Sequence, residues 1–70
     1  MSFVQYSVDV GARIAIRWPR PTLAAFVGRV GTVVEVFRVP LDSCMVRLDG
    51  DPNNQREWFF YRDEFAISDA

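Results

Sequence analysis

The sequence contains no histidine and no lysine, and its 70 residues include a single cysteine, Cys44. Histidine is the usual general base of serine and cysteine hydrolases and the commonest zinc ligand, so its absence argues against both kinds of site. A single cysteine cannot form a disulfide within the chain. We therefore expect a protein that is not an enzyme by itself and that carries no metal and no cofactor.

Long apolar runs are also missing. The longest unbroken stretch, residues 23–27, is far shorter than the roughly 20 residues that a membrane-spanning helix needs. Polar residues at Gln5, Ser7 and Asp9 interrupt any secretory signal at the start of the sequence. We expect a cytoplasmic protein with no membrane partner, folded as one domain over residues 1–70.

Charge is divided unevenly along the chain. Residues 1–48 carry a net charge of +3 and residues 49–70 a net charge of −4, so the formal total is −1. Domains that bind a phosphate backbone are usually strongly basic. The total therefore argues against nucleic-acid binding, whereas the arginine-rich first half leaves it open.

Short β-prone runs separated by turn residues fill the chain, and no segment has an apolar period of 3.6 residues over ten or more positions. Two close prolines, Pro19 and Pro21, exclude a central strand there and indicate a long loop. Thr22 is the expected cap of one helical turn, and a 3₁₀ turn is expected at residues 62–64. The predicted strands span residues 12–17, 32–39, 44–48, 57–61 and 65–67, with 3–8 as an extra edge strand or cover and 68–70 frayed.

Four stretches carry a resemblance to a known fold: VGARIAI at 10–16, GRVGTVVEV at 28–36, MVRLD at 45–49 and WFFYRDEF at 58–65. Together they resemble a small bacterial SH3-like barrel over residues 8–67. The second stretch is similar to KOW modules of ribosomal and transcription factors. The last is similar to the end of the variable chain of ferredoxin–thioredoxin reductase and of small nitrogen-fixation accessory proteins.

This resemblance implies an all-β, five-stranded barrel with a long proline-containing loop after the first strand. For function it implies either a partner-binding subunit or a nucleic-acid binder, because the fold serves many unrelated tasks. The reductase chain has a histidine-bearing loop where this sequence has Trp18, Pro19, Arg20 and Pro21. RNA-binding KOW modules are also usually more basic than this chain.

The predicted strands carry more apolar side chains than one face of such a sheet can bury. Trp58 and Phe60 fall on one face of the fourth strand, and Phe59 and Tyr61 on the other. Residues 32–39 are apolar on both faces, with Val34 and Val36 opposite Val33, Phe37 and Val39, so their register is ambiguous. Each fully buried aliphatic or phenylalanine side chain contributes about 1.5–3 kcal/mol, so we expect the second face to be covered.

Two interpretations of how this second face is covered remain open. Residues 1–8, with Phe3 and Tyr6, and the loop bearing Trp18 and Phe26 could fold over the outer face. Alternatively, a protein partner or a second copy of the chain covers it, since aromatic and arginine residues are typical interface anchors. The second interpretation makes the protein a small interaction module or accessory subunit and predicts four partner contacts: Trp18, Phe59, Tyr61 and Arg62.

The alternative function is RNA or DNA binding by a KOW-like module. Arginines would contact phosphates and an aromatic side chain would stack on a base. The predicted residues for this function are Arg13, Arg17, Trp18 and Arg20.

Three further features could suggest a metal or catalytic site, but each has a simpler structural explanation. Asp49, Asp51 and Asn53 have the spacing of calcium ligands, but Asn54 and Phe60 stand where a calcium loop needs glycine and glutamate, so a turn is favoured. Cys44 alternates with apolar residues and is expected in the core. Asp63 and Glu64 are expected in solvent, and a chain this small is expected to lack room for a small-molecule pocket of about 300 Å³.

Overall fold

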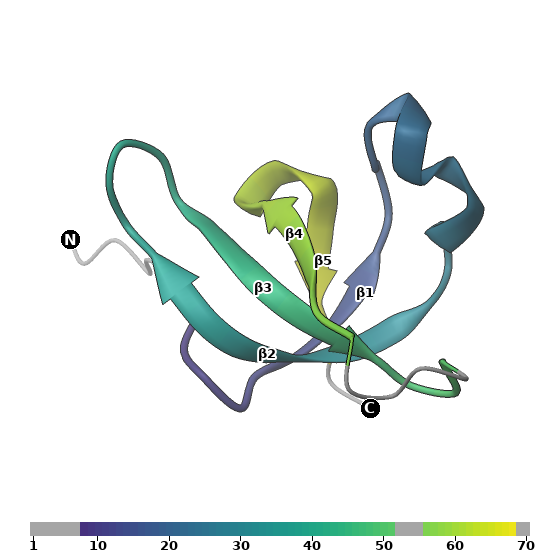
Figure 1. Ribbon diagram of the computed structural model, residues 1–70, viewed down its shortest axis with the longest axis horizontal. Coiled ribbons are helices and arrows are strands. Elements are labelled where there is room, and N and C mark those ends of the chain that lie inside the picture. The colour runs from purple at the N-terminus through teal and green to yellow at the C-terminus, as the bar shows by residue number, and fades with distance from the viewer. Residues whose placement is uncertain (1–7, 52–55, 69–70) are drawn as a thin grey trace, which may run out of the picture.

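The computed structural model describes residues 8–51 and 56–68, which form five strands and two short 3₁₀ segments (Figure 1). The all-β class predicted from the sequence is confirmed. Longer helices are absent from this part of the chain, and none of its helices is long and apolar enough to cross a membrane. The elements are β1 (Arg13–Ile16), η1 (Pro21–Phe26), β2 (Val30–Phe37), β3 (Ser43–Leu48), β4 (Trp58–Tyr61), η2 (Arg62–Glu64) and β5 (Phe65–Ile67).

The strands form one antiparallel sheet in the order β4-β3-β2-β1-β5. Successive strands from β1 to β4 pair as neighbours, and β5 then returns to pair with β1 at the other end of the sheet. The sheet is strongly curled (Figure 1). Its end strands, β4 and β5, do not pair with each other over the described residues, so the sheet is open.

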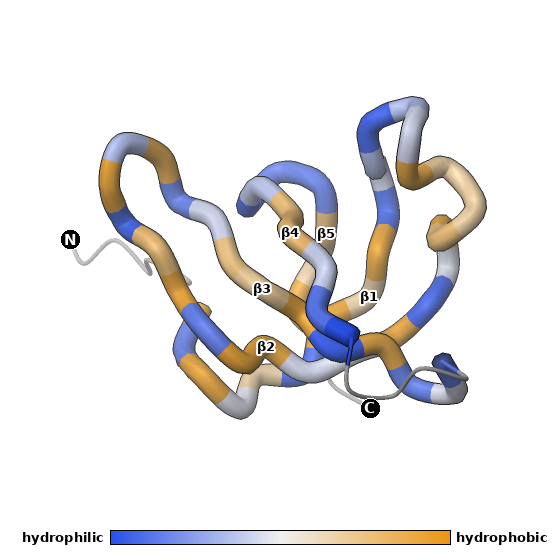
Figure 2. The backbone as a smooth tube through the Cα atoms, viewed as in Figure 1, coloured by the Kyte–Doolittle hydropathy of each residue, from blue (hydrophilic) through white to orange (hydrophobic). Residues whose placement is uncertain are grey.

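The core lies on the concave side of the sheet. Ile14 and Ile16 are fully buried, as their alternation with polar neighbours predicts, and Phe60 and Phe65 close the centre from the later strands. Figure 2 shows the matching alternation of apolar and polar segments along the strands. The buried apolar set is Val8, Ile14, Ile16, Val33, Cys44, Val46, Leu48, Phe60 and Phe65.

A β-bulge in β2 explains why residues 32–39 are apolar on both faces. Val33 pairs with Val46, but Glu35 pairs with Met45, so Val34 is an extra residue in β2. After the bulge, Val36 packs against the core, as Val33 does before it. The predicted grouping of Val34 with Val36, opposite Val33, is therefore wrong, because it assumed an unbroken alternation.

The long loop after β1 closes one end of the core. Leu23 and Phe26 of η1 pack against the core, and the Phe26 ring meets the Trp58 ring edge-on at 4.7 Å. The 3₁₀ segment begins at Pro21 and has Arg20 as its N-cap, without a side-chain capping bond, so the predicted Thr22 cap is wrong. The predicted turn at residues 62–64 is confirmed as η2.

The predicted extra strand at residues 3–8 lies outside the described residues except for Val8, which is buried. At the other end, the Ser68 N–H donates a hydrogen bond to the Arg13 carbonyl at 2.8 Å. The described chain therefore stays attached to β1 for one residue beyond β5.

Candidate partner-binding surface

Arg20 and Glu64 occupy the free edge of β4. The Arg20 Nη2 donates to the Phe59 carbonyl at 2.7 Å, and the Tyr61 N–H donates to Glu64 Oε1 at 2.8 Å. The two side chains bind each other through Nη2–Oε1 at 2.7 Å and Nε–Oε2 at 3.1 Å. Because unpaired edge groups invite pairing with another chain, this ion pair protects the edge of the sheet.

Glu64 is 6% exposed, so the prediction that it is solvated is wrong. Burial raises the pKa of this carboxyl, but hydrogen bonds from the Arg20 guanidinium and from the backbone N–H groups of Tyr61 and Arg20 outweigh burial. The net effect is a pKa below the ordinary value of 4.5. Glu64 is therefore a charged structural residue rather than a candidate acid or base.

Three aromatic rings line the outer face of β2 and β4. Phe37 and Phe59 lie 6.2 Å apart between ring centroids, and Phe59 meets Tyr61 edge-on at 5.1 Å. The Arg20 Cζ lies 5.6 Å from the Phe59 centroid and 5.1 Å from the Tyr61 centroid. The first two rings are half-buried, whereas Tyr61 is 39% exposed. We call Phe37, Phe59 and Tyr61 the aromatic row.

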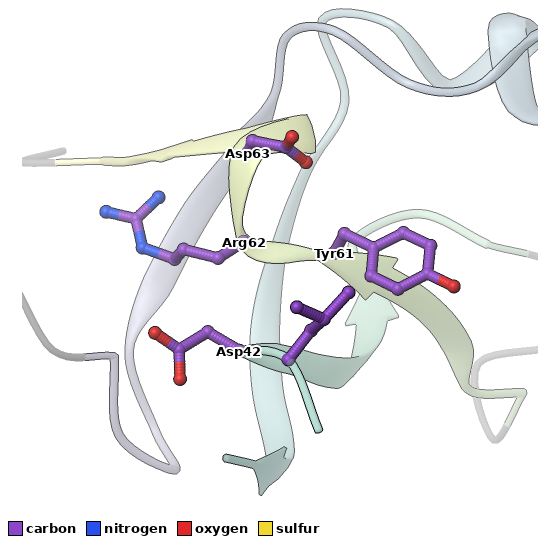
Figure 3. Close-up of a pocket in the computed structure, with 5 residues that line it drawn as sticks. Asp42, Tyr61, Arg62 and Asp63 are labelled. Atoms are coloured by element: carbon purple, nitrogen blue, oxygen red, sulfur yellow. The ribbon is translucent and has the colours of Figure 1, made fainter. Parts of the chain in front are cut away.

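An open pocket of about 490 Å³ adjoins the exposed end of this row. Its walls come from the end of the β2–β3 hairpin, the end of β4 and the start of η2 (Figure 3). A hydrogen bond from the Arg62 N–H to the Asp42 carbonyl at 3.0 Å joins these elements. The pocket is larger than the volume of about 300 Å³ for which the sequence predicted no room. It forms between the β2–β3 hairpin and η2, outside the core. The lining residues are Leu41, Asp42, Tyr61, Arg62 and Asp63.

The pocket combines apolar surface with charge. Leu41 is 62% exposed and lines the pocket together with Tyr61. Arg62 donates to the Phe65 carbonyl at 3.1 Å and lies 5.1 Å from the Phe65 ring centroid. Its guanidinium points away from Tyr61 (Figure 3). The predicted contact residue Arg62 therefore borders the pocket but is held by internal contacts.

Trp18 is the most exposed of the four predicted contacts, at 67%. The backbone N–H groups of Arg17 and Trp18 both donate to the Glu64 carbonyl at 3.0 Å. This attachment places the first residues of the loop beside η2, and Arg62 and Asp63 of η2 line the pocket. The structure thus brings Phe59 and Tyr61 together, places Arg62 in the pocket lining and attaches the Trp18 backbone to Glu64 at the end of η2.

The four predicted nucleic-acid contacts are not equally available. The Arg13 guanidinium pairs with Asp49 and donates to the Thr32 hydroxyl at 2.8 Å. Arg20 is held by Glu64, as described above. Arg17 and Trp18 are both exposed. Two of the three arginines are therefore already paired with carboxylates.

The residues with calcium-like spacing and Cys44 have structural explanations. Asp49 pairs with Arg13, which lowers the pKa of that carboxyl, and Asp51 accepts a hydrogen bond from Trp58 Nε1 at 3.2 Å. Asn53 lies outside the described residues. Over residues 8–51 and 56–68 there is no group of three residues that could hold a metal ion. Cys44 is buried, and burial raises the pKa of its thiol to about 11.

No sequence pattern predicts a role for Leu41 or Asp42, or the pairing of Arg20 with Glu64. Leu41 and Asp42 lie between two predicted strands, and the available signal there is an apolar residue between Pro40 and an acid. Comparisons with protein-family models, with curated proteins and with solved structures found no match to this chain. Any functional conclusion therefore depends on the geometry of the surface itself.

Proposed function

We propose that this protein is a non-catalytic interaction module or accessory subunit that binds a protein partner at the aromatic row and the adjoining pocket. The observation that carries the proposal is the continuity of these two features. The half-buried rings of Phe37 and Phe59 lead to the exposed Tyr61, which lines the pocket together with the exposed Leu41. Protein interfaces have this composition, with aromatic anchors at the centre and charged groups around them.

The energetics of exposure support a protein partner. Leu41 and Tyr61 present apolar surface to water, and so does Val39 at the tip of the hairpin. Burying apolar surface contributes about 25 cal/mol per Å², so a partner that covers these neighbouring side chains gains affinity. The loop after β1 places the Arg20 guanidinium over the Phe59 and Tyr61 rings. Tyr61 is nevertheless 39% exposed, so part of its ring is available to a partner.

We also infer that the curled sheet is a small SH3-like barrel. The strand order β4-β3-β2-β1-β5 supports this assignment, because the two end strands are consecutive in the chain and a single 3₁₀ turn joins them. The bonds from Arg17 and Trp18 to Glu64 tie the end of β1 to that turn. In this arrangement the aromatic row and the pocket are displayed on one side of the barrel.

Site-specific photo-crosslinking in the source cells tests the proposed function. Benzoylphenylalanine replaces Tyr61 in one version of the chain and the exposed Ala25 of η1 in a control version. We expect a crosslinked protein from position 61 that is absent from position 25. The identified partner is then purified, and its binding is measured by calorimetry against the native chain and against Tyr61→Ser.

Binding that is lost in Tyr61→Ser, while the circular dichroism and melting temperature of the variant stay native, supports the proposal. No product above the control at position 61 overturns it. A partner whose affinity is the same for both chains also overturns it, because the contact would then lie elsewhere.

A further inference from the structure

The pocket carries two carboxylates without a partner in the monomer. Across residues 8–51 and 56–68, neither Asp42 nor Asp63 forms a side-chain ion pair or hydrogen bond. The guanidinium of Arg62, the other charge in the lining, is turned toward Phe65. The lining therefore has a net negative charge beside the apolar surface of Leu41 and Tyr61.

The complementary groups lie on the loop that follows β1. Arg17 is exposed, and its guanidinium has no partner among the described residues. Trp18 beside it exposes 67% of its surface, the largest aromatic exposure among those residues. A cation next to a large aromatic ring matches a pocket that offers two carboxylates next to a tyrosine and a leucine.

The two features flank the same turn. Arg17 and Trp18 are attached to Glu64 of η2 by their backbone, and Asp63 is the preceding residue of that turn. A surface that carries a group and its complement side by side is self-complementary. In a two-fold dimer each copy then supplies both halves, so the contact is made twice and closes on itself.

We propose that the pocket is occupied by a second copy of this chain, whose Trp18 packs on Tyr61 and Leu41 while its Arg17 pairs with Asp63 or Asp42. This inference rests on the proposed function and names the partner. It also accounts for the exposure of Trp18, which tryptophan side chains in interfaces lose on binding. Because few residues take part, we expect a weak and reversible dimer rather than an obligate one.

Charge reversal tests the pairing. We expect sedimentation equilibrium of the native chain to show a monomer–dimer equilibrium, and Arg17→Glu or Asp63→Arg to raise its dissociation constant about tenfold or more, because each places like charges opposite each other twice. Mixing the two variants restores both attractive pairs in a heterodimer. Titration of one variant into the other by calorimetry is expected to give an affinity close to the native one.

The mixture excludes an ion pair within one chain, because two separately defective chains could not repair such a pair by association. The matched control mixes Arg17→Glu with Glu35→Arg, which has the same net charge as Asp63→Arg but alters an exposed position of β2 that does not line the pocket. We expect clearly weaker binding in this control than in the first mixture, because only one of the two pairs in its heterodimer is attractive and position 17 of the first variant faces Asp63 of the other chain. Asp42→Arg is tested in the same way, and restoration by either pocket variant supports the proposal.

Three results would overturn the dimer. One is a native chain that stays monomeric up to its solubility limit, and another is self-association that Trp18→Ser and Arg17→Glu leave unchanged. The third is failure of both pocket variants to restore binding in the mixture. If position 61 nevertheless crosslinks to a different protein, the interaction surface stands and only the identity of the partner is wrong.

Discussion

Arg20 and Glu64 lie 44 positions apart in the chain and form a bidentate ion pair at the free edge of β4. The pair also binds one carbonyl and two backbone N–H groups of the surrounding segments. It thereby connects the long loop to β4 and η2 and holds Arg20 over two rings of the aromatic row. The interaction surface depends on this connection for its shape.

Removing one partner of this ion pair should destabilise the fold. For Glu64→Ala we expect a loss of about 2–3 kcal/mol in the free energy of unfolding, less than for a fully buried pair because Arg20 keeps part of its side chain in water. The exposed pair of Arg13 and Asp49 provides the control. Asp49→Ala should cost much less, because solvent screens this exposed pair. Urea denaturation measures both, and equal losses would contradict the structural role of Glu64.

Glu64 should also make the free energy of unfolding depend on pH under acidic conditions. Because the folded state lowers the pKa of Glu64 below 4.5, the stabilisation is fully present above that value and is lost as pH falls through the folded pKa. We expect the unfolding free energy to decline as the pH falls below about 4.5 and the decline to be shallower in Glu64→Gln. An identical pH profile for the native chain and the variant would show that Glu64 does not control it.

Sequence patterns predicted the parts of the fold that depend on local alternation. Ile14 and Ile16 are buried on one face of β1, and Phe60 is buried between the exposed or half-buried Phe59 and Tyr61, as expected. The bulge at Val34 was not predictable in the same way. When both faces of a strand are apolar, no change of hydropathy marks the position at which the inward face switches.

The candidate site was predicted only in part for a related reason. Phe59 and Tyr61 follow from strand alternation, because each has a buried neighbour on the opposite face. The pairing of Arg20 with Glu64, and the pocket that Leu41 and Tyr61 line together, depend on separate segments meeting in the fold. No local period encodes these arrangements, so the sequence alone predicts Arg20 as a phosphate ligand of the alternative function and Glu64 as a solvated acid.

Gly31 should tolerate no side chain, because β2 and β3 approach closely at this position. A Cβ placed on Gly31 would lie 2.7 Å from the Arg47 carbonyl oxygen and 2.8 Å from Val46 Cγ1. For Gly31→Ala we expect a loss of about 1–3 kcal/mol, the usual cost of overpacking. Thermal unfolding measures the loss. A native or raised melting temperature would mean that the strands separate more easily at this point than the contacts indicate.

Cys44 should be unreactive in the folded protein. Its thiol is buried, and the raised pKa of about 11 leaves little thiolate at neutral pH. We expect reaction with an excess of a thiol reagent to follow opening of the fold, so that its rate rises with urea concentration. Fast labelling in the absence of denaturant would contradict the burial of Cys44 between β2 and β4.

Nucleic-acid binding should be weak, because Arg13 and Arg20 are paired with carboxylates and Arg17 is the remaining member of the predicted set. Each phosphate that an arginine neutralises on a single strand contributes about −0.7 to the slope of log affinity against log salt concentration. A single available arginine therefore predicts a slope of about −0.7 for any binding to single-stranded RNA, measured by fluorescence anisotropy. A slope of about −2 or steeper, abolished in Arg13→Glu/Arg17→Glu, would show that the ion pairs open on binding and would favour the KOW-like function instead.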